Sequence, residues 1–204
     1  MPQPLDTLKE TPSQTAGPYL HIGLMPTFVG IRGPHAGDLG SRMVGDKTKG
    51  ERITIEGSVI DGGGEPLRDC LVEVWQADAA GLYPSPSETR GAADPNFTGW
   101  GRAAADPQSG VFRFETIKPG RCPFPDGRLQ APHVSLWIVA RGINLGLNTR
   151  LYFGDEAEAN AADPILSRIE PQSRVGTLIA RRNGNTFSLD IHLQGPDETV
   201  FFDI

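Results

Sequence analysis

Short runs in which apolar and polar residues alternate recur along this chain, and a period of two predicts β-strands. In the clearest run, residues 186–193, four apolar side chains share one face of an extended chain: Phe187, Leu189, Ile191 and Leu193. Strand character also marks six other runs, which are residues 52–60, 70–76, 111–117, 133–140, 147–153 and 199–202. The 25 glycines and 18 prolines fall between such runs, as expected of a many-turned β protein. The pattern predicts a mainly β fold, an antiparallel β-sandwich.

Two late segments have the period of a helix instead. Residues 155–162 read DEAEANAA, and residues 173–182 place four side chains on one helical stripe after a capping Ser173: Val175, Leu178, Ile179 and Arg182. We expect both segments to be short helical insertions between late strands.

The first fifty residues carry little pattern and read largely as a long loop. A loop of that length usually has a function or a partner that orders it. We therefore expect residues 1–50 to be an N-terminal arm that contacts a partner, and residues 51–204 to be a single β-sandwich domain, since 204 residues suit one domain of this class.

Charge and apolar runs exclude several classes of partner. The chain has 19 Lys and Arg residues against 25 Asp and Glu residues, a net charge of −6, which argues against nucleic acid or an anionic membrane surface. No apolar run approaches the roughly 20 residues that span a bilayer, and the first residues lack the layout of a secretion signal. We expect a cytoplasmic protein in which Cys70 and Cys122 are reduced thiols.

One strand carries candidate metal chemistry. In residues 131–137, APHVSLW, the side chains of His133, Ser135 and Trp137 point to one face of an extended chain. Two histidines at that spacing would begin a metal site, whereas here the second position holds a serine. Taken alone, His133 is better explained as a hydrogen-bonded core histidine than as a metal ligand.

The other candidates are weaker. His192 lies on the polar face of its strand, and His21 and His35 lie in N-terminal loops with no partner at ligand spacing, so we expect hydrogen-bonding roles for all three. Residues 61–66, DGGGEP, join two strands without the following helix and Lys of a phosphate loop, which predicts a turn. A Ser-His-Asp triad has no G-x-S-x-G motif to support it.

Taken together, five segments resemble the intradiol ring-cleavage dioxygenases in their order along the chain: TPSQTAGPY (11–19), VEVWQADAAGLY (72–83), GWGRAAADPQSGVFRFETIKPG (99–120), APHVSLWIVARGIN (131–144) and TRLYF (149–153). The resemblance covers nearly the whole chain after residue 10 and is weakest in residues 25–50. It implies the β-sandwich core of that family, with an N-terminal arm and helical insertions.

The resemblance also implies a metal and its ligands. Iron-bearing members of the family hold a non-haem ferric ion with two tyrosinates and two histidines, oxygen and nitrogen donors that suit Fe(III). Tyr83 matches the first tyrosinate, and Cys122 stands where the second would be. His133 matches one histidine, and Ser135 stands where the other would be. The resemblance therefore implies that this chain lacks two of four ligands and binds no metal itself.

Two neighbouring positions depart from the family as well. Gln130 replaces an arginine that precedes the first histidine in iron-bearing chains, and Arg150 replaces a glutamine. We expect Arg150 to occupy the space of the lost metal site and either to pair with a nearby acid or to hydrogen-bond Tyr83.

Some members of this family are built from alpha and beta chains. The two chains share one fold, and only beta binds Fe(3+), so a chain of this fold without a complete set of iron ligands is expected among them. The resemblance implies an alpha subunit in a hetero-oligomer that cleaves protocatechuate with O2 to 3-carboxy-cis,cis-muconate, a step of beta-ketoadipate catabolism of aromatic compounds. It also implies that Thr15, Gly17 and Tyr19 in the arm, and Arg141 after the strand, line an active site formed against beta. A guanidinium there would attract the carboxylate of the substrate.

Two other functions stay open on the sequence. The chain could be an iron enzyme by itself, if Cys122 or another residue served as a ligand. It could also be a transthyretin-like binding or scaffolding module with no catalytic partner.

Overall fold

The computed structural model describes residues 15–203, so the first fourteen residues of the predicted arm and Ile204 lie outside it. Within this range the chain forms nine strands: β1 (Arg52–Ile60), β2 (Leu71–Trp75), β3 (Trp100–Ala104), β4 (Val111–Ile117), β5 (His133–Val139), β6 (Leu147–Phe153), β7 (Ile179–Asn183), β8 (Thr186–Ser188) and β9 (Ile191–His192). Its helices are short: α1 (Pro18–Leu24), α2 (Ala157–Ala161) and the 3-10 helices η1 (Leu166–Arg168) and η2 (Gln172–Leu178). The predicted mainly β class is confirmed, and in residues 15–203 no helix is both long enough and apolar enough to cross a membrane.

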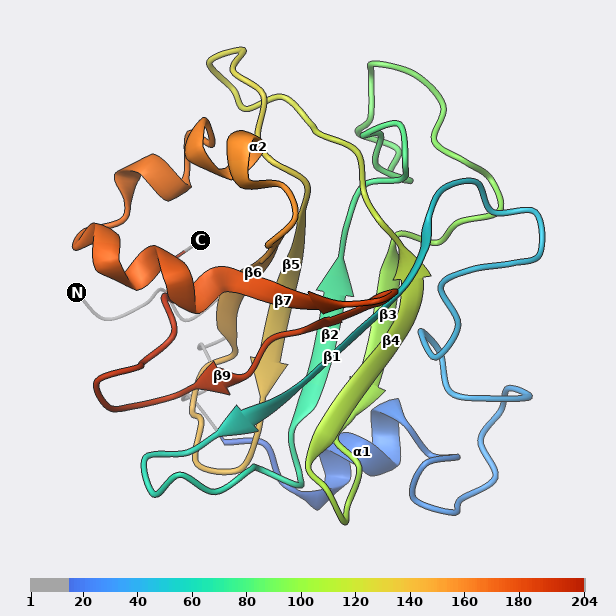
Figure 1. Cartoon of the computed structure of the whole chain (residues 1–204). Coiled ribbons are helices and arrows are strands. Elements are labelled where there is room, and N and C mark those ends of the chain that lie inside the picture. Colours follow the sequence, from blue (N-terminus) through green and yellow to red (C-terminus); the bar gives the residue numbers. More distant parts are fainter. Residues whose placement is uncertain (1–14, 204) are drawn as a thin grey trace, which may run out of the picture.

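The strands follow one hydrogen-bonded path, β3-β2-β5-β6-β7-β8-β1-β4, with β9 beside β1. The path folds back on itself, so that β3, at one end, contacts β4 at the other (Figure 1). One apolar core fills the space between the two halves, with side chains such as Val74 and Leu136 from one half and Ile55 and Phe114 from the other. The predicted sandwich therefore holds as a nearly closed two-layered structure, in which β1–β8, β1–β9 and β6–β7 are parallel and the other pairs antiparallel.

The run predicted as one strand over residues 186–193 is interrupted. Its two parts, β8 and β9, both pair with β1, and the chain between them passes over Gly57, where an added Cβ would lie 1.9 Å from Leu189 O. At the break the Asp190 carboxylate accepts a hydrogen bond from Ser58 N at 2.9 Å. A side chain thus takes the place of a backbone partner at this point.

Other local predictions differ from the structure. The helix predicted over residues 173–182 begins at Gln172 without a Ser173 cap and ends at Leu178, after which β7 pairs with β6 and β8. Residues 199–202 form an isolated bridge to Asn148 rather than a strand. The predicted helix in residues 155–162 is confirmed as α2.

The β2–β5 pair positions the residues of functional interest. Leu71 pairs with Val139 at one end, and Trp75 pairs with Ser135 at the other. Asp69 and Arg141 lie two residues beyond the Leu71–Val139 pair, in the turns that flank these strands. A strand of seven residues is about 20 Å long, so side chains near His133 and side chains near Arg141 lie at opposite ends of β5.

Two candidate sites at opposite ends of strand β5

A small cavity lies where the N-terminal arm meets the end of β5. Its volume is about 240 Å³, and we name it the arm cavity after its lining: Ala16, Gly17, Pro18, His21, Asp69 and Arg141. Thr15 fixes the arm beside it, because its hydroxyl donates to Ala140 O at 3.3 Å and accepts from Gly142 N at 2.7 Å. The structure therefore brings together Thr15, Gly17 and Arg141, three of the four residues expected to line a site.

The fourth residue, Tyr19, lies in α1 with 83% of its surface exposed and does not line the cavity. Arg141 forms an ion pair there, with Nε 3.0 Å from Asp69 Oδ2, and its side chain is 78% exposed. Asp69 and His21 were not predicted as members of this site. The β2–β5 pairing could have indicated Asp69, whereas His21 lines the cavity only because Pro18 begins a helix that the sequence pattern did not predict.

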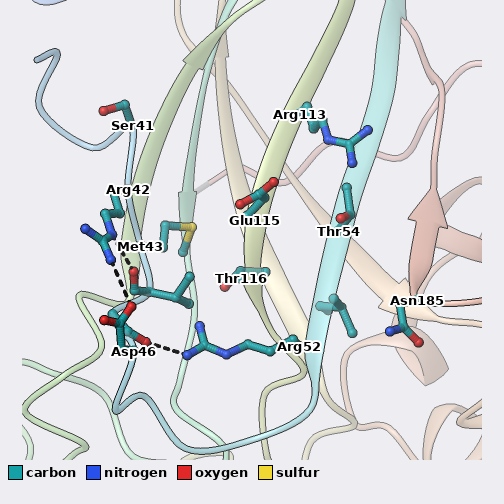
Figure 2. Close-up of a pocket in the computed structure, with 13 residues that line it drawn as sticks. Ser41, Arg42, Met43, Asp46, Arg52, Thr54, Arg113, Glu115, Thr116 and Asn185 are labelled. Carbon is teal, nitrogen blue, oxygen red and sulfur yellow. Dashed lines mark hydrogen bonds and ion pairs between the residues drawn. The ribbon is translucent and has the colours of Figure 1, made fainter.

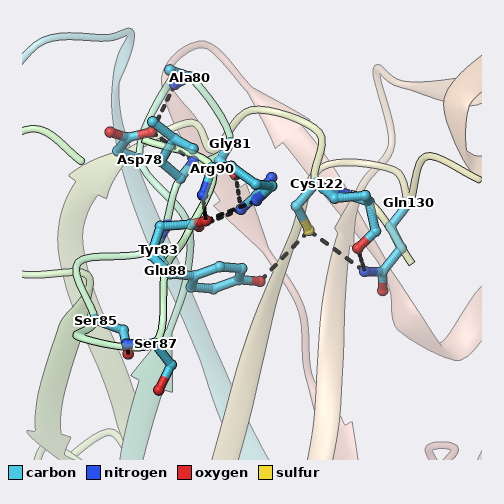
Figure 3. Close-up of polar contacts among 12 residues, drawn as sticks. Asp78, Ala80, Gly81, Tyr83, Ser85, Ser87, Glu88, Arg90, Cys122 and Gln130 are labelled. Carbon is cyan, nitrogen blue, oxygen red and sulfur yellow. Dashed lines mark hydrogen bonds and ion pairs between the residues drawn. The ribbon is translucent and has the colours of Figure 1, made fainter. Parts of the chain in front are cut away.

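A second group of polar side chains lies at the other end of β5, and we name it the polar cluster: Tyr83, Cys122, Gln130, His133, Ser135 and Arg150. Figure 3 shows Cys122 between Tyr83 and Gln130, with Sγ 3.7 Å from the phenol oxygen and 3.5 Å from Gln130 Nε2. Arg150 Nη1 donates to Gln130 Oε1 at 2.9 Å. A continuous chain of polar contacts thus joins β6 to the loops that hold Gln130, Cys122 and Tyr83.

The expected role of Arg150 is corrected by these contacts. Arg150 does lie at the site, opposite Ser135 in the β5–β6 register. Its guanidinium bonds Gln130 and the hydroxyl of Tyr152, the latter at 3.3 Å, rather than Tyr83. Within residues 15–203 it makes no ion pair, because the nearby Asp163 carboxylate is taken up by Tyr152 and by backbone N–H groups.

His133 is buried at 3% exposure, and its Nδ1 lies 2.8 Å from Ala131 O. Burial, together with the positive charge of Arg150, lowers the pKa of His133 to about 4. The ring is therefore neutral at neutral pH and donates through Nδ1 to the carbonyl. The observed environment is that of a hydrogen-bonded core histidine.

Tyr83 is positioned by the loop that follows β2. The Asp78 carboxylate accepts from Ala80 N and Leu82 N, each at 2.9 Å, and Glu88 Oε2 accepts from Tyr83 N at 3.0 Å. The ring stacks on Trp75 with centroids 5.7 Å apart. Burial first, and then the adjacent Cys122, raise the pKa of the Tyr83 phenol, which is therefore neutral.

The polar cluster does not fit a ferric ion. Only Tyr83 and His133 offer the expected donor types, and the Arg150 guanidinium adds a positive charge to the same hydrogen-bonded network. A fixed cation opposes binding of a second cation nearby.

A larger cavity, about 790 Å³, lies elsewhere, between strands β1 and β4 and the segment that precedes β1 (Figure 2). Its arginines are already engaged. Arg42 lies 3.5 Å from Asp46, Arg113 lies 3.4 Å from Glu56, and Arg52 donates to backbone carbonyls of that segment. We assign this cavity no function.

Comparisons with known proteins agree on one family. A family model described as Dioxygenase matches residues 24–195. The protocatechuate 3,4-dioxygenase alpha chain of Pseudomonas putida is 44% identical over 204 residues, which is 98% of this chain and 99% of that protein. The beta chain of Burkholderia cepacia is 38% identical over 74% of this chain and 67% of that protein. Among solved structures, 3-chlorocatechol 1,2-dioxygenase of Rhodococcus opacus has a TM-score of 0.54 at 22% identity, covering 79% of this chain and 69% of that one.

Proposed function

The chain belongs to the intradiol ring-cleavage dioxygenase family, and from this premise we propose that it is the alpha subunit of a protocatechuate 3,4-dioxygenase. In the proposed complex with a beta subunit, protocatechuate is cleaved by O2 to 3-carboxy-cis,cis-muconate. Fe(3+) is held by beta and supplies the activation of the bound catechol. This chain contributes lining residues and a positively charged side chain to the shared active site.

The polar cluster is the observation that supports the proposal that beta, rather than this chain, holds the iron. A chain that held iron would need four donors at these positions, whereas here the Cys122 thiol is enclosed by Tyr83 and Gln130, and Gln130 is bonded to a guanidinium. The chemistry that the family performs therefore has to be completed by another chain. The identity to an alpha chain over nearly the whole length of both proteins supports the same assignment.

The arm cavity is the part of this chain that we assign to the shared active site. Thr15 is hydrogen-bonded to the segment after β5, Gly17 lines the cavity, and Arg141 presents an exposed guanidinium beside them. Arg141 would attract the carboxylate of protocatechuate, which is remote from the carbons that react. Tyr19, exposed on α1, and the remainder of the arm in residues 1–50 are proposed to contact beta.

A purification of this chain with and without its beta partner tests the proposal. Co-expressed chains should elute together, contain iron and cleave protocatechuate, whereas this chain alone should be inactive and contain no stoichiometric iron. Iron and activity in the isolated chain would overturn the proposed role. A stable oligomer of this chain that remains inactive with its co-expressed beta partner would instead favour a transthyretin-like scaffolding module.

A further inference from the structure

We propose that Asp69 is a specificity-determining residue that lowers the affinity of Arg141 for carboxylates. The substrate then still binds, whereas the more highly charged product is released. The inference rests on the proposed function, because it assumes that Arg141 meets the carboxylate of protocatechuate. It adds a residue to which neither the sequence motifs nor the resemblance assigned a role.

The position of Asp69 is set by the fold rather than by a flexible contact. It precedes β2 by two residues, and Arg141 follows β5 by two residues; because Leu71 pairs with Val139, the two residues lie at the same end of the strand pair. Asp69 Oδ2 lies 3.0 Å from Arg141 Nε. Within residues 15–203 this is the only ion pair of Arg141, so its two terminal nitrogens are available to a second carboxylate.

The charges around the arm cavity are few. Of its lining residues, Ala16, Gly17 and Pro18 carry no charged side chain, and the remaining three are one imidazole, one carboxylate and one guanidinium. Asp69 and Arg141 carry opposite charges and are paired with each other. A carboxylate that binds Arg141 is therefore attracted by the guanidinium and repelled by a fixed anion in contact with the same guanidinium.

The reaction changes the charge of the ligand. Protocatechuate carries one carboxylate at neutral pH. Cleavage between the two hydroxylated carbons consumes one O2, places one of its atoms on each carbon, and creates two new carboxylic acids that release two protons at neutral pH. Because Coulomb energy scales with the product of the charges, Asp69 repels the product, with three carboxylates, more than it repels the substrate, with one.

The variant Asp69→Asn in the assembled complex tests this inference. Asparagine keeps the size of the side chain and removes its charge at a partly exposed position, so folding should be preserved. The probes are two competitive inhibitors, 4-hydroxybenzoate with one carboxylate and 3-carboxy-cis,cis-muconate with three. We expect the inhibition constant to fall about threefold for 4-hydroxybenzoate and about tenfold for the product, at low salt.

A matched control removes a similar charge elsewhere. Glu56 is paired with Arg113 at 3.4 Å on the outer side of β1 and β4, and its side chain is 33% exposed, against 38% for Asp69. Glu56→Gln should leave both inhibition constants unchanged. Unchanged constants in the Asp69→Asn complex would overturn the inference, and weaker inhibition would overturn it by showing that Asp69 orients Arg141. The inactivity of the unmodified complex would refute the proposed function instead.

Discussion

The two ends of β5 are built in opposite ways. At the arm cavity, charged side chains are exposed, and Arg141 uses only Nε in its ion pair among the described residues, which leaves its two terminal nitrogens available. At the polar cluster, Cys122, Gln130 and His133 are buried, and their polar atoms are engaged by one another or by the backbone. An open end is expected of a surface that a partner completes. We call the other end closed because its polar atoms bond one another or the backbone, although a cavity of about 370 Å³ lined by Tyr83, Cys122 and Gln130 lies beside them.

The closed end should be the more sensitive of the two to loss of a single polar group. Asp163 is fully buried, and its carboxylate accepts hydrogen bonds from Ala131 N, Ile165 N and Leu166 N. Asp163→Ala leaves these donors without their partner and should lower the free energy of unfolding by roughly 3–5 kcal/mol. Urea unfolding measures the loss, and Asp163→Asn, which keeps one acceptor oxygen, should lose less. An alanine variant as stable as the unmodified chain would refute this account of the closed end.

The charge of Arg150 should decide whether the closed end can be reopened to a metal. Cys122→Tyr with Ser135→His restores the four donor types, yet we expect this double variant to bind iron poorly. A fixed cation near a ferric ion costs several kcal/mol even at an effective dielectric constant of about 20. Addition of Arg150→Gln should raise iron occupancy well above that of the double variant.

Iron analysis and tyrosinate-to-iron absorption of the purified chain report the occupancy. A double variant that already fills with iron would show that the charge of Arg150 is unimportant. A folded triple variant that remains colourless would show that these positions do not correspond to the iron ligands.

Burial of His133 should make stability depend on pH. Its folded pKa of about 4 lies below the ordinary value of 6.5, so the unfolded chain binds more protons between these values. Stability is therefore fully present above about pH 6.5 and falls as the pH approaches 4, by roughly 3 kcal/mol at about 1.4 kcal/mol per pH unit. Urea unfolding of the unmodified chain and of His133→Gln, compared between pH 4 and 7, isolates this contribution. Parallel pH profiles for the two chains would contradict it.

Much of the fold follows from local pattern. The strands with clear alternation, such as β1 and β4, were predicted because their buried and exposed faces are set by a period of two. The pattern failed for β3, whose sequence WGRAA has no apolar alternation, and for β7, where Ile179 follows the 3-10 helix without a polar break. Both strands are held mainly by their neighbours in the sheet, which a local pattern does not contain.

The candidate sites were predictable to different degrees. The resemblance predicted that Tyr83, Cys122 and His133 lie in one cluster. It did not predict the link through Gln130 to Arg150, because that link depends on side-chain packing. The arm cavity depends on strand register, which unites residues about 70 positions apart. Register is a tertiary property.

The functional difference between the two ends of β5 is tested most directly by substituting one arginine at each end, in the assembled complex. Arg141→Ala removes a charge-assisted contact worth roughly 1.5–3 kcal/mol, so kcat/KM for protocatechuate should fall roughly 10- to 100-fold, mainly through KM, and less for catechol, which has no carboxylate. Arg150→Gln should leave kcat/KM for protocatechuate within about twofold, since it lies at the other end of β5. An equal loss in both variants, or a loss with Arg150→Gln alone, would contradict the account.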